Sequence, residues 1–119
     1  MHIYYLLYKS VLNFVRPTIY KNKYMLLSKT EALILQIMSE NGFREIYGLE
    51  LLRLSNGGIK RGTIYTTLQR MQDKGFVTSR QEEKPDDVSG IPRRLYEITG
   101  IGQRTLQAYE FISADLVTT

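Results

Sequence analysis

A short segment, residues 62–73, carries hydroxyl, amide and guanidinium groups at the spacing of one helix face. Thr63, Thr66, Gln69 and Arg70 follow one another at intervals that bring them to a common side of an α-helix. A hydroxyl can bind a phosphate or contact a thymine methyl, a glutamine amide can pair with adenine, and a guanidinium can bind guanine O6 and N7. The pattern therefore predicts a surface for DNA, although a polar helix face of this kind is often only solvated.

Neighbouring residues extend this prediction. Cations just before a helix attract phosphate together with the free backbone N–H groups of its first turn, and cations beside a hairpin loop can reach the DNA backbone. The alternative for Arg93 and Arg94 is pairing with Glu82 and Glu83 across the hairpin. The candidate DNA-binding residues are Lys60, Arg61, Thr63, Tyr65, Thr66, Thr67, Gln69, Arg70, Lys84, Arg93 and Arg94.

Catalytic and metal chemistry finds little support in the sequence. Cysteine is absent and the single histidine is His2, which excludes disulfides, thiol nucleophiles and Cys-based zinc sites and leaves no imidazole cluster within one chain. The acidic residues show no spacing that suggests acid–base chemistry. We therefore expect no enzyme, no catalytic residue, no metal and no cofactor, and the lack of cysteine fits the cytoplasm.

Length and charge point to one small domain with a local basic region. The chain has 119 residues, of which 43% are apolar and 24% charged, as in an ordinary globular domain. Residues 1–24 contain four basic residues and no acidic one, so they account for the net charge of +4. Within the otherwise neutral remainder, residues 59–94 hold eight basic side chains against five acidic ones. A surface for a polyanion should lie there.

The elements that would position the polar face begin with two helices. Ser28 and Glu31 form a capping box, which predicts a helix that ends at Asn41 and Gly42. A second helix is expected from about 47 to 54, with Leu51, Leu52 and Leu54 facing inward, before the turn at 55–58. These leucines are interpreted as core.

The third helix, a hairpin and a last helix follow. Helix 62–73 would bury Ile64, Leu68 and Met71 and end at Gly75. Residues 76–81 and 93–99 are rich in strand-forming residues and should pair around an exposed loop at 84–92. Thr99 caps a final helix that reaches about residue 117. Its apolar stripe consists of Leu106, Tyr109, Ile112 and Leu116.

Residues 1–24 differ from the remainder and allow two interpretations. They contain five of the nine tyrosines, and one helix face before Pro17 would carry Ile3, Leu6, Leu7, Val11 and Phe14. The segment is either an additional amphipathic helix or an overlong reading frame whose true start is Met25. Its apolar stretch is too short for a stable membrane span of about 20 residues, and attachment to a membrane surface is a weaker alternative.

Three helices followed by a two-stranded ribbon have the order of a winged helix-turn-helix. The expected fold is thus mainly α with a small β-hairpin, a winged helix-turn-helix plus a C-terminal dimerisation helix. Residues 1–24 form an N-terminal extension, residues 25–99 the DNA-binding domain and residues 100–119 the dimerisation helix. The third helix takes the recognition position.

Several motifs together resemble the PadR family of bacterial and archaeal transcriptional regulators. They are Arg61–Val77 (RGTIYTTLQRMQDKGFV), Pro92–Thr99 (PRRLYEIT) and Gly102–Leu106 (GQRTL), preceded by Leu33–Leu35 and Tyr47–Leu51, which look like the first two helices of the family. The resemblance covers residues 26 to about 112 and is much more specific as a combination than in any part.

This resemblance implies a homodimeric winged-helix repressor whose last helix supplies much of the dimer contact. Some relatives sense phenolic acids or hydrophobic drugs at the dimer interface, so a small-molecule effector of unknown identity is a further expected partner. The chain departs from the family pattern in its extension 1–24 and in the acidic loop tip at Asp86 and Asp87.

The leading hypothesis is a sequence-specific repressor that binds a pseudo-palindromic operator as a homodimer. One short helix reads only a few base pairs, and two half-sites roughly 34 Å apart are the usual solution. The dimer would bury Leu106, Tyr109, Ile112 and Leu116. The alternative is a winged-helix protein-interaction module without DNA binding.

Overall fold

The computed structural model describes residues 27–83 and 93–118. The extension 1–24 and the loop 84–92, with Lys84, lie outside the described residues. The elements run in the order α2 (Lys29–Glu40), β1 (Ile46–Tyr47), α3 (Gly48–Leu54), α4 (Arg61–Asp73), β2 (Val77–Gln81), β3 (Arg94–Ile98) and α5 (Gly100–Thr118). This mainly helical fold with a small antiparallel sheet confirms the predicted fold class.

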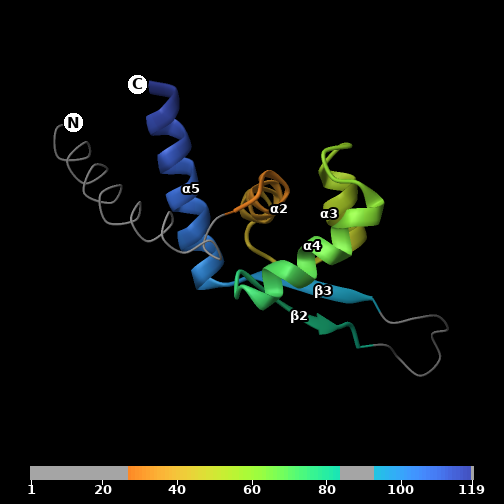
Figure 1. Cartoon of the computed structure of the whole chain (residues 1–119). Coiled ribbons are helices and arrows are strands. Elements are labelled where there is room, and N and C mark those ends of the chain that lie inside the picture. The colour runs from red at the N-terminus through yellow and green to blue at the C-terminus, as the bar shows by residue number, and fades with distance from the viewer. Residues whose placement is uncertain (1–26, 84–92, 119) are drawn as a thin grey trace.

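The helices lie side by side above the strands. In Figure 1, α5 stands at one side of the body, α3 and α4 lie at the other, and α2 lies between them. The expected recognition helix and the expected dimerisation helix are therefore at opposite sides of α2. Among the described residues, no helix is both long and apolar enough to cross a membrane.

The sheet has three strands in the order β1-β3-β2, all antiparallel. Strands β2 and β3 pair as the expected hairpin, with Val77 opposite Ile98 and Gln81 opposite Arg94. The sequence did not predict β1, in which Ile46 pairs with Tyr96. A strand of two residues is too short to give a periodic pattern, yet it ties the start of α3 to the hairpin.

Local sequence signals set the ends of α2 and α4. The capping box is present: the Glu31 N–H donates to Ser28 Oγ at 3.1 Å, and the Ser28 N–H donates to Glu31 Oε1 at 2.9 Å. At the end of α4, Gly75 has φ +82°, a conformation that favours glycine. The Phe76 N–H then bonds the Met71 carbonyl at 2.9 Å, which completes a Schellman turn and delivers the Phe76 ring into the core.

The core lies between the helices and the inner face of the sheet. Its buried members come from every described element, and they include the predicted stripe of α4: Ile34, Leu35, Ile37, Met38, Ile46, Leu51, Ile59, Ile64, Leu68, Met71, Phe76, Val77, Tyr96, Ile98 and Leu106. Leu54 was expected to face inward but is exposed. It is the last residue of a seven-residue helix that ends at the edge of this core.

A buried ion pair joins the start of α2 to the end of α4. Lys74 Nζ lies 2.9 Å from Glu31 Oε2, with side chains 15% and 1% exposed. The same carboxylate accepts the capping bond from Ser28. Glu31 therefore fixes both the first turn of its own helix and the position of α4.

The N-terminal turn of α5 packs directly on backbone. Thr99 caps the helix by accepting from the Gly102 N–H at 3.0 Å. A Cβ at Gly102 would lie 2.2 Å from the carbonyl oxygen of Phe76, so only glycine fits. One turn further, Leu106 is 4% exposed and belongs to the core of its own chain. This corrects its assignment to the dimer interface, because the close approach at Gly102 turns this side of α5 toward α2.

We expect Glu31→Gln to lower the free energy of unfolding by about 3 kcal/mol, as is typical when a buried ion pair loses one partner. Glutamine keeps an acceptor for the cap, so the loss reports the charge. Glu40→Gln, at the exposed end of the same helix, should change stability by less than about 0.5 kcal/mol. Urea unfolding followed by circular dichroism measures both, and equal effects would contradict the role assigned to the ion pair.

Gly102→Ala should destabilise the protein by about 1–3 kcal/mol, the usual cost of an overpacked site. Gly62 offers the control, since a Cβ there meets no atom within 4 Å. Gly62→Ala should leave stability unchanged or raise it by up to about 1 kcal/mol. Thermal unfolding of the two variants gives the comparison, and a stable Gly102→Ala protein would show that α5 does not need this close approach.

Candidate nucleic-acid interface

The two sides of α4 differ sharply in exposure. Ile64, Leu68 and Met71 are fully buried, while the opposite side exposes Thr63, Thr66, Gln69 and Arg70. Because the buried stripe packs into the core, α4 cannot rotate about its own axis, and its polar side stays exposed. The structure therefore presents hydroxyl, amide and guanidinium groups together on one outward face.

Most of the candidate DNA-binding residues lie at the surface. The exposed ones are Lys60, Arg61, Thr63, Tyr65, Thr66, Gln69, Arg70, Arg93 and Arg94. Thr67 is the correction, because its side chain is 5% exposed. It stands three residues after Ile64 and four before Met71, which places it beside the buried stripe. Thr67 is thus a core residue and is not available to a ligand of this face.

Hydrogen bonds on the polar face leave some groups free and occupy others. The Thr63 hydroxyl donates to the Lys60 carbonyl at 3.0 Å, so the oxygen of this hydroxyl remains an acceptor. Gln69 Nε2 donates to Asp73 Oδ1 at 3.1 Å, and Gln69 must release this bond before it can pair with a base. The Arg70 side chain makes no hydrogen bond or ion pair with the described part of the chain, so its guanidinium is available to a ligand.

Ion pairing sorts the described cations into two groups. Arg44, Arg53, Lys74, Arg80 and Arg93 each have a carboxylate within 4.0 Å. The described cations without such a partner are Lys29, Lys60, Arg61, Arg70, Arg94 and Arg104. Four of these six lie at the start of α4, on its outer face or on the neighbouring β3. The positive charge without a carboxylate partner among the described residues is thus concentrated around α4.

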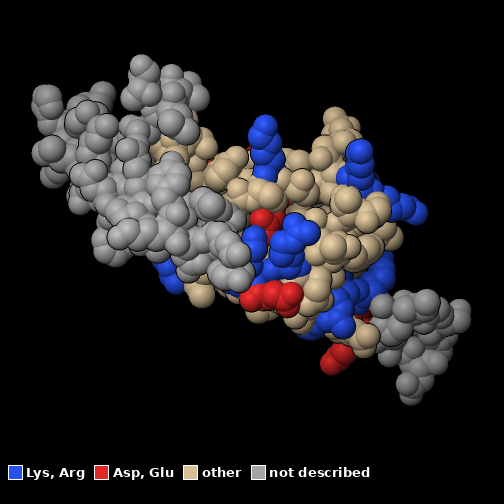
Figure 2. All heavy atoms as spheres, viewed as in Figure 1, with Lys and Arg blue, Asp and Glu red and all other residues tan. Residues whose placement is uncertain are grey.

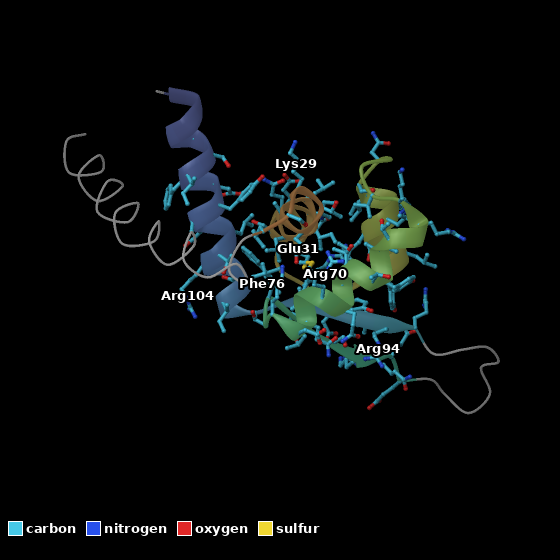
Figure 3. The ribbon with its side chains drawn as sticks, in the orientation of Figure 1. Lys29, Glu31, Arg70, Phe76, Arg94 and Arg104 are labelled. Atoms are coloured by element: carbon cyan, nitrogen blue, oxygen red, sulfur yellow. The ribbon has the colours of Figure 1, made fainter. Side chains whose placement is uncertain are left out.

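The figures show the same concentration. In Figure 2, the Lys and Arg atoms gather over α4 and the adjoining strand ends, with a few acidic atoms among them. Figure 3 places Arg70 on α4 and Arg94 on the strand below it, while Lys29 and Arg104 lie apart on α2 and α5. A polyanion would meet this face of the molecule first.

An open groove of about 970 Å³ lies between α3, α4 and the loop end of the hairpin. It is lined by Tyr47, Gly48, Leu49, Glu50, Arg53, Tyr65, Arg93, Arg94 and Tyr96. The half-exposed Tyr65 ring covers Gly48, where a Cβ would lie 2.7 Å from the ring. The groove continues the polar face of α4 toward the hairpin.

The loop end of the hairpin contains a hydrogen-bond cluster of its own. Arg93 Nε donates to Glu82 Oε2 at 3.3 Å, as the alternative hypothesis for this residue held, and its guanidinium lies 4.1 Å from the centre of the Tyr47 ring. Arg94 instead donates to Ser79 Oγ at 2.9 Å and keeps its charge unpaired among the described residues.

Tyr47 and Tyr96, two of the three tyrosines that line the groove, remain phenols at neutral pH. The pKa of Tyr47 is raised first by its hydrogen bond to Glu82 and then by burial. The pKa of Tyr96 is raised by burial, against an opposing effect of Arg94. Nearby, the pKa of Glu50 is lowered, mainly because Arg44 donates a hydrogen bond to it. The groove therefore keeps hydroxyl donors and a fully ionised, already paired carboxylate.

Sequence reasoning missed Tyr47 and Arg53 as residues of this region, and it did not link Tyr47 to Glu82. Tyr47 and Glu82 are 35 positions apart, and no local pattern links them; only the pairing of β1 with β3 brings them together. The described part of the chain has no group of three His, Cys, Asp or Glu side chains that could hold a metal ion.

The expected dimer face is only partly described. Tyr109 and Ile112 are half-buried on α5, while the side chain of Leu116 lies outside the described residues. With Leu106 in the core, the described part of this face is narrower than the sequence suggested.

The sequence matches the model of the transcriptional regulator PadR-like family over residues 34–108, more than half of the chain. The chain belongs to this family. Membership confirms the resemblance and the expectation that the protein is not an enzyme, since PadR proteins are transcriptional regulators. None of the curated proteins compared with the chain matches it.

Solved PadR structures share the fold. Bacillus subtilis PadR in complex with operator DNA aligns with a TM-score of 0.59 at 19% identity, covering 70% of this chain and 47% of that chain. A PadR-like transcription factor from Bacteroides fragilis gives 0.64 at 21% identity, covering 75% and 84%. A PadR family regulator from Clostridium difficile R20291 gives 0.59 at 26% identity, covering 76% and 97%. The chain thus spans about half the B. subtilis protein and nearly all of the C. difficile one.

Proposed function

We propose that this PadR-like regulator binds operator DNA through α4 and acts in the cytoplasm as a homodimeric repressor. The observation that carries the proposal is the exposed polar face of α4 with unpaired cations around it. Lys60, Arg61 and Arg70 have no carboxylate partner among the described residues, and Arg94 lies close by on β3. That the B. subtilis relative was crystallised with operator DNA supports the same reading of the shared fold.

In this proposal the residues of the face contact different parts of the DNA. Arg70 and Thr66 stand in the middle of α4, where a recognition helix meets base edges in the major groove. Lys60 and Arg61 stand at its start and suit backbone phosphates. Gln69 would contact adenine only after it leaves Asp73, so its contribution depends on that exchange. Lys84 remains a candidate in the loop outside the described residues.

A homodimer would supply the second half-site. A single α4 spans few base pairs, and a two-fold pair of such helices reads a pseudo-palindrome with half-sites roughly 34 Å apart. The half-buried Tyr109 and Ile112 on α5 are the described residues that a partner chain would cover. Repression then follows simply, because a dimer that occupies a promoter excludes the polymerase.

Arg70→Ala should weaken binding to a duplex selected by the wild-type chain from a random-sequence pool, by at least about fivefold, as expected for loss of one guanidinium contact to a base. If Arg70 binds phosphate, the slope of log K against log salt should also fall by about one unit. Fluorescence anisotropy at several salt concentrations measures both.

Arg104 provides the matched control. It is another exposed arginine without a described ion-pair partner, but it lies at the base of α5, away from α4 (Figure 3). Arg104→Ala should leave affinity and slope unchanged. Equal losses in the two variants would reduce the effect to net charge alone, and the absence of any enriched duplex would favour the protein-interaction module instead.

Ile112→Asp should convert the dimer to monomer while α5 stays helical, because a buried unpaired carboxylate at an interface is strongly unfavourable. Gln107→Asp places the same charge on an exposed position of α5 and should leave the dimer intact. Sedimentation velocity at micromolar concentration distinguishes the two. A monomeric wild-type chain, or an intact Ile112→Asp dimer, would contradict the proposed interface.

A further inference from the structure

Three side chains from separate parts of the chain meet at the loop end of the hairpin. Tyr47 ends β1, Glu82 follows β2, and Arg93 precedes β3. The Tyr47 hydroxyl donates to Glu82 Oε1 at 2.5 Å, and Arg93 Nε donates to Glu82 Oε2 at 3.3 Å. A backbone hydrogen bond of 2.7 Å from the Glu82 N–H to the Arg93 carbonyl holds these two residues together. The cluster thus fixes one arginine relative to α3.

The geometry leaves the outer end of Arg93 free. Within the Arg93 guanidinium, only Nε donates to Glu82, and neither Nη1 nor Nη2 has a partner among the described residues. One face of the guanidinium lies on the Tyr47 ring, 4.1 Å from its centre. The two terminal nitrogens, which form the fork that grips a phosphate or carboxylate, are therefore held in place and unoccupied.

This arginine lies where an anion would be attracted. Arg93 lines the groove together with Arg53 and Arg94, beside Tyr65 of the recognition helix. The one carboxylate of the lining, Glu50, is already bonded to Arg44 at 2.8 Å. A DNA backbone that runs past the outer face of α4 would bring its phosphates to this groove.

We infer that Glu82 is a positioning residue, which holds Arg93 on the Tyr47 ring so that its two outer nitrogens bind one backbone phosphate of the operator. The inference rests on the proposed function. Arg93 is 60% exposed, and an ion pair this exposed contributes little to stability. The ion pair instead favours DNA binding by preorganising Arg93, because a long side chain that is already ordered loses less entropy when it binds.

A set of variants separates positioning from charge. Glu82→Ala removes both the hydrogen bonds and the negative charge. Glu82→Gln removes the charge but keeps an oxygen that accepts from Arg93 Nε, and its amide N–H can donate to the Tyr47 hydroxyl oxygen. Each change is made in the full chain and again in an Arg93→Ala background, and affinity for the selected duplex is measured by fluorescence anisotropy.

Glu82→Ala should weaken binding by about threefold to tenfold, the cost of ordering one long side chain. Glu82→Gln should restore the wild-type affinity to within about twofold, since its hydrogen bonds position the arginine in the same way. In the Arg93→Ala background, Glu82→Ala should have no further effect, because there is no arginine left to position.

Other outcomes overturn the inference. Tighter binding by both Glu82 variants would show that this carboxylate only repels DNA. An equal loss from Glu82→Ala with and without Arg93 would show a structural role for the loop end of the hairpin. If the wild-type chain enriches no duplex, the proposed function itself fails, whereas an Arg70→Ala loss without any Glu82 effect contradicts the positioning role alone.

Discussion

The fixed orientation of α4 is the constraint on which the rest of the molecule depends. Ile64, Leu68 and Met71 anchor one side of the helix in the core, and the buried Glu31 carboxylate holds Lys74 at its end. Because breaking either contact exposes apolar surface or strands a charge, the helix has one stable rotation. The polar side is thus exposed as a consequence of packing, and the chemistry of the face depends on the core beneath it.

Electrostatics then distinguishes this face from an ordinary solvated surface. Elsewhere the described arginines other than Arg104 are paired with glutamates, as Arg44 is with Glu50 and Arg80 with Glu45. Around α4 the described cations Lys60, Arg61, Arg70 and Arg94 have no such partner. A net charge of +4 does not by itself identify a binding surface. These four cations, however, surround the exposed polar side of α4.

Local signals in the sequence were sufficient for most of the fold. Ser28 with Glu31, the glycine at 75 and the spacing of Ile64, Leu68 and Met71 predicted the ends and faces of two helices, because each acts within a few residues. Interactions across long separations gave no such signal. Strand β1, the pairing of Glu31 with Lys74 and that of Tyr47 with Glu82 appear only when the chain is folded. Thr67 and Leu106 were misassigned for a related reason, since exposure depends on what packs opposite.

The protein's lack of cysteine permits the most direct test, a single-cysteine Thr66→Cys variant that carries a DNA-cleaving iron chelate. If α4 lies in the major groove of an operator bound by two copies, cleavage should fall in two symmetric clusters about 10 base pairs apart. Gln107→Cys, on the exposed side of α5, should give none. Uniform cleavage from both sites, or none from residue 66 on a bound duplex, would contradict the account.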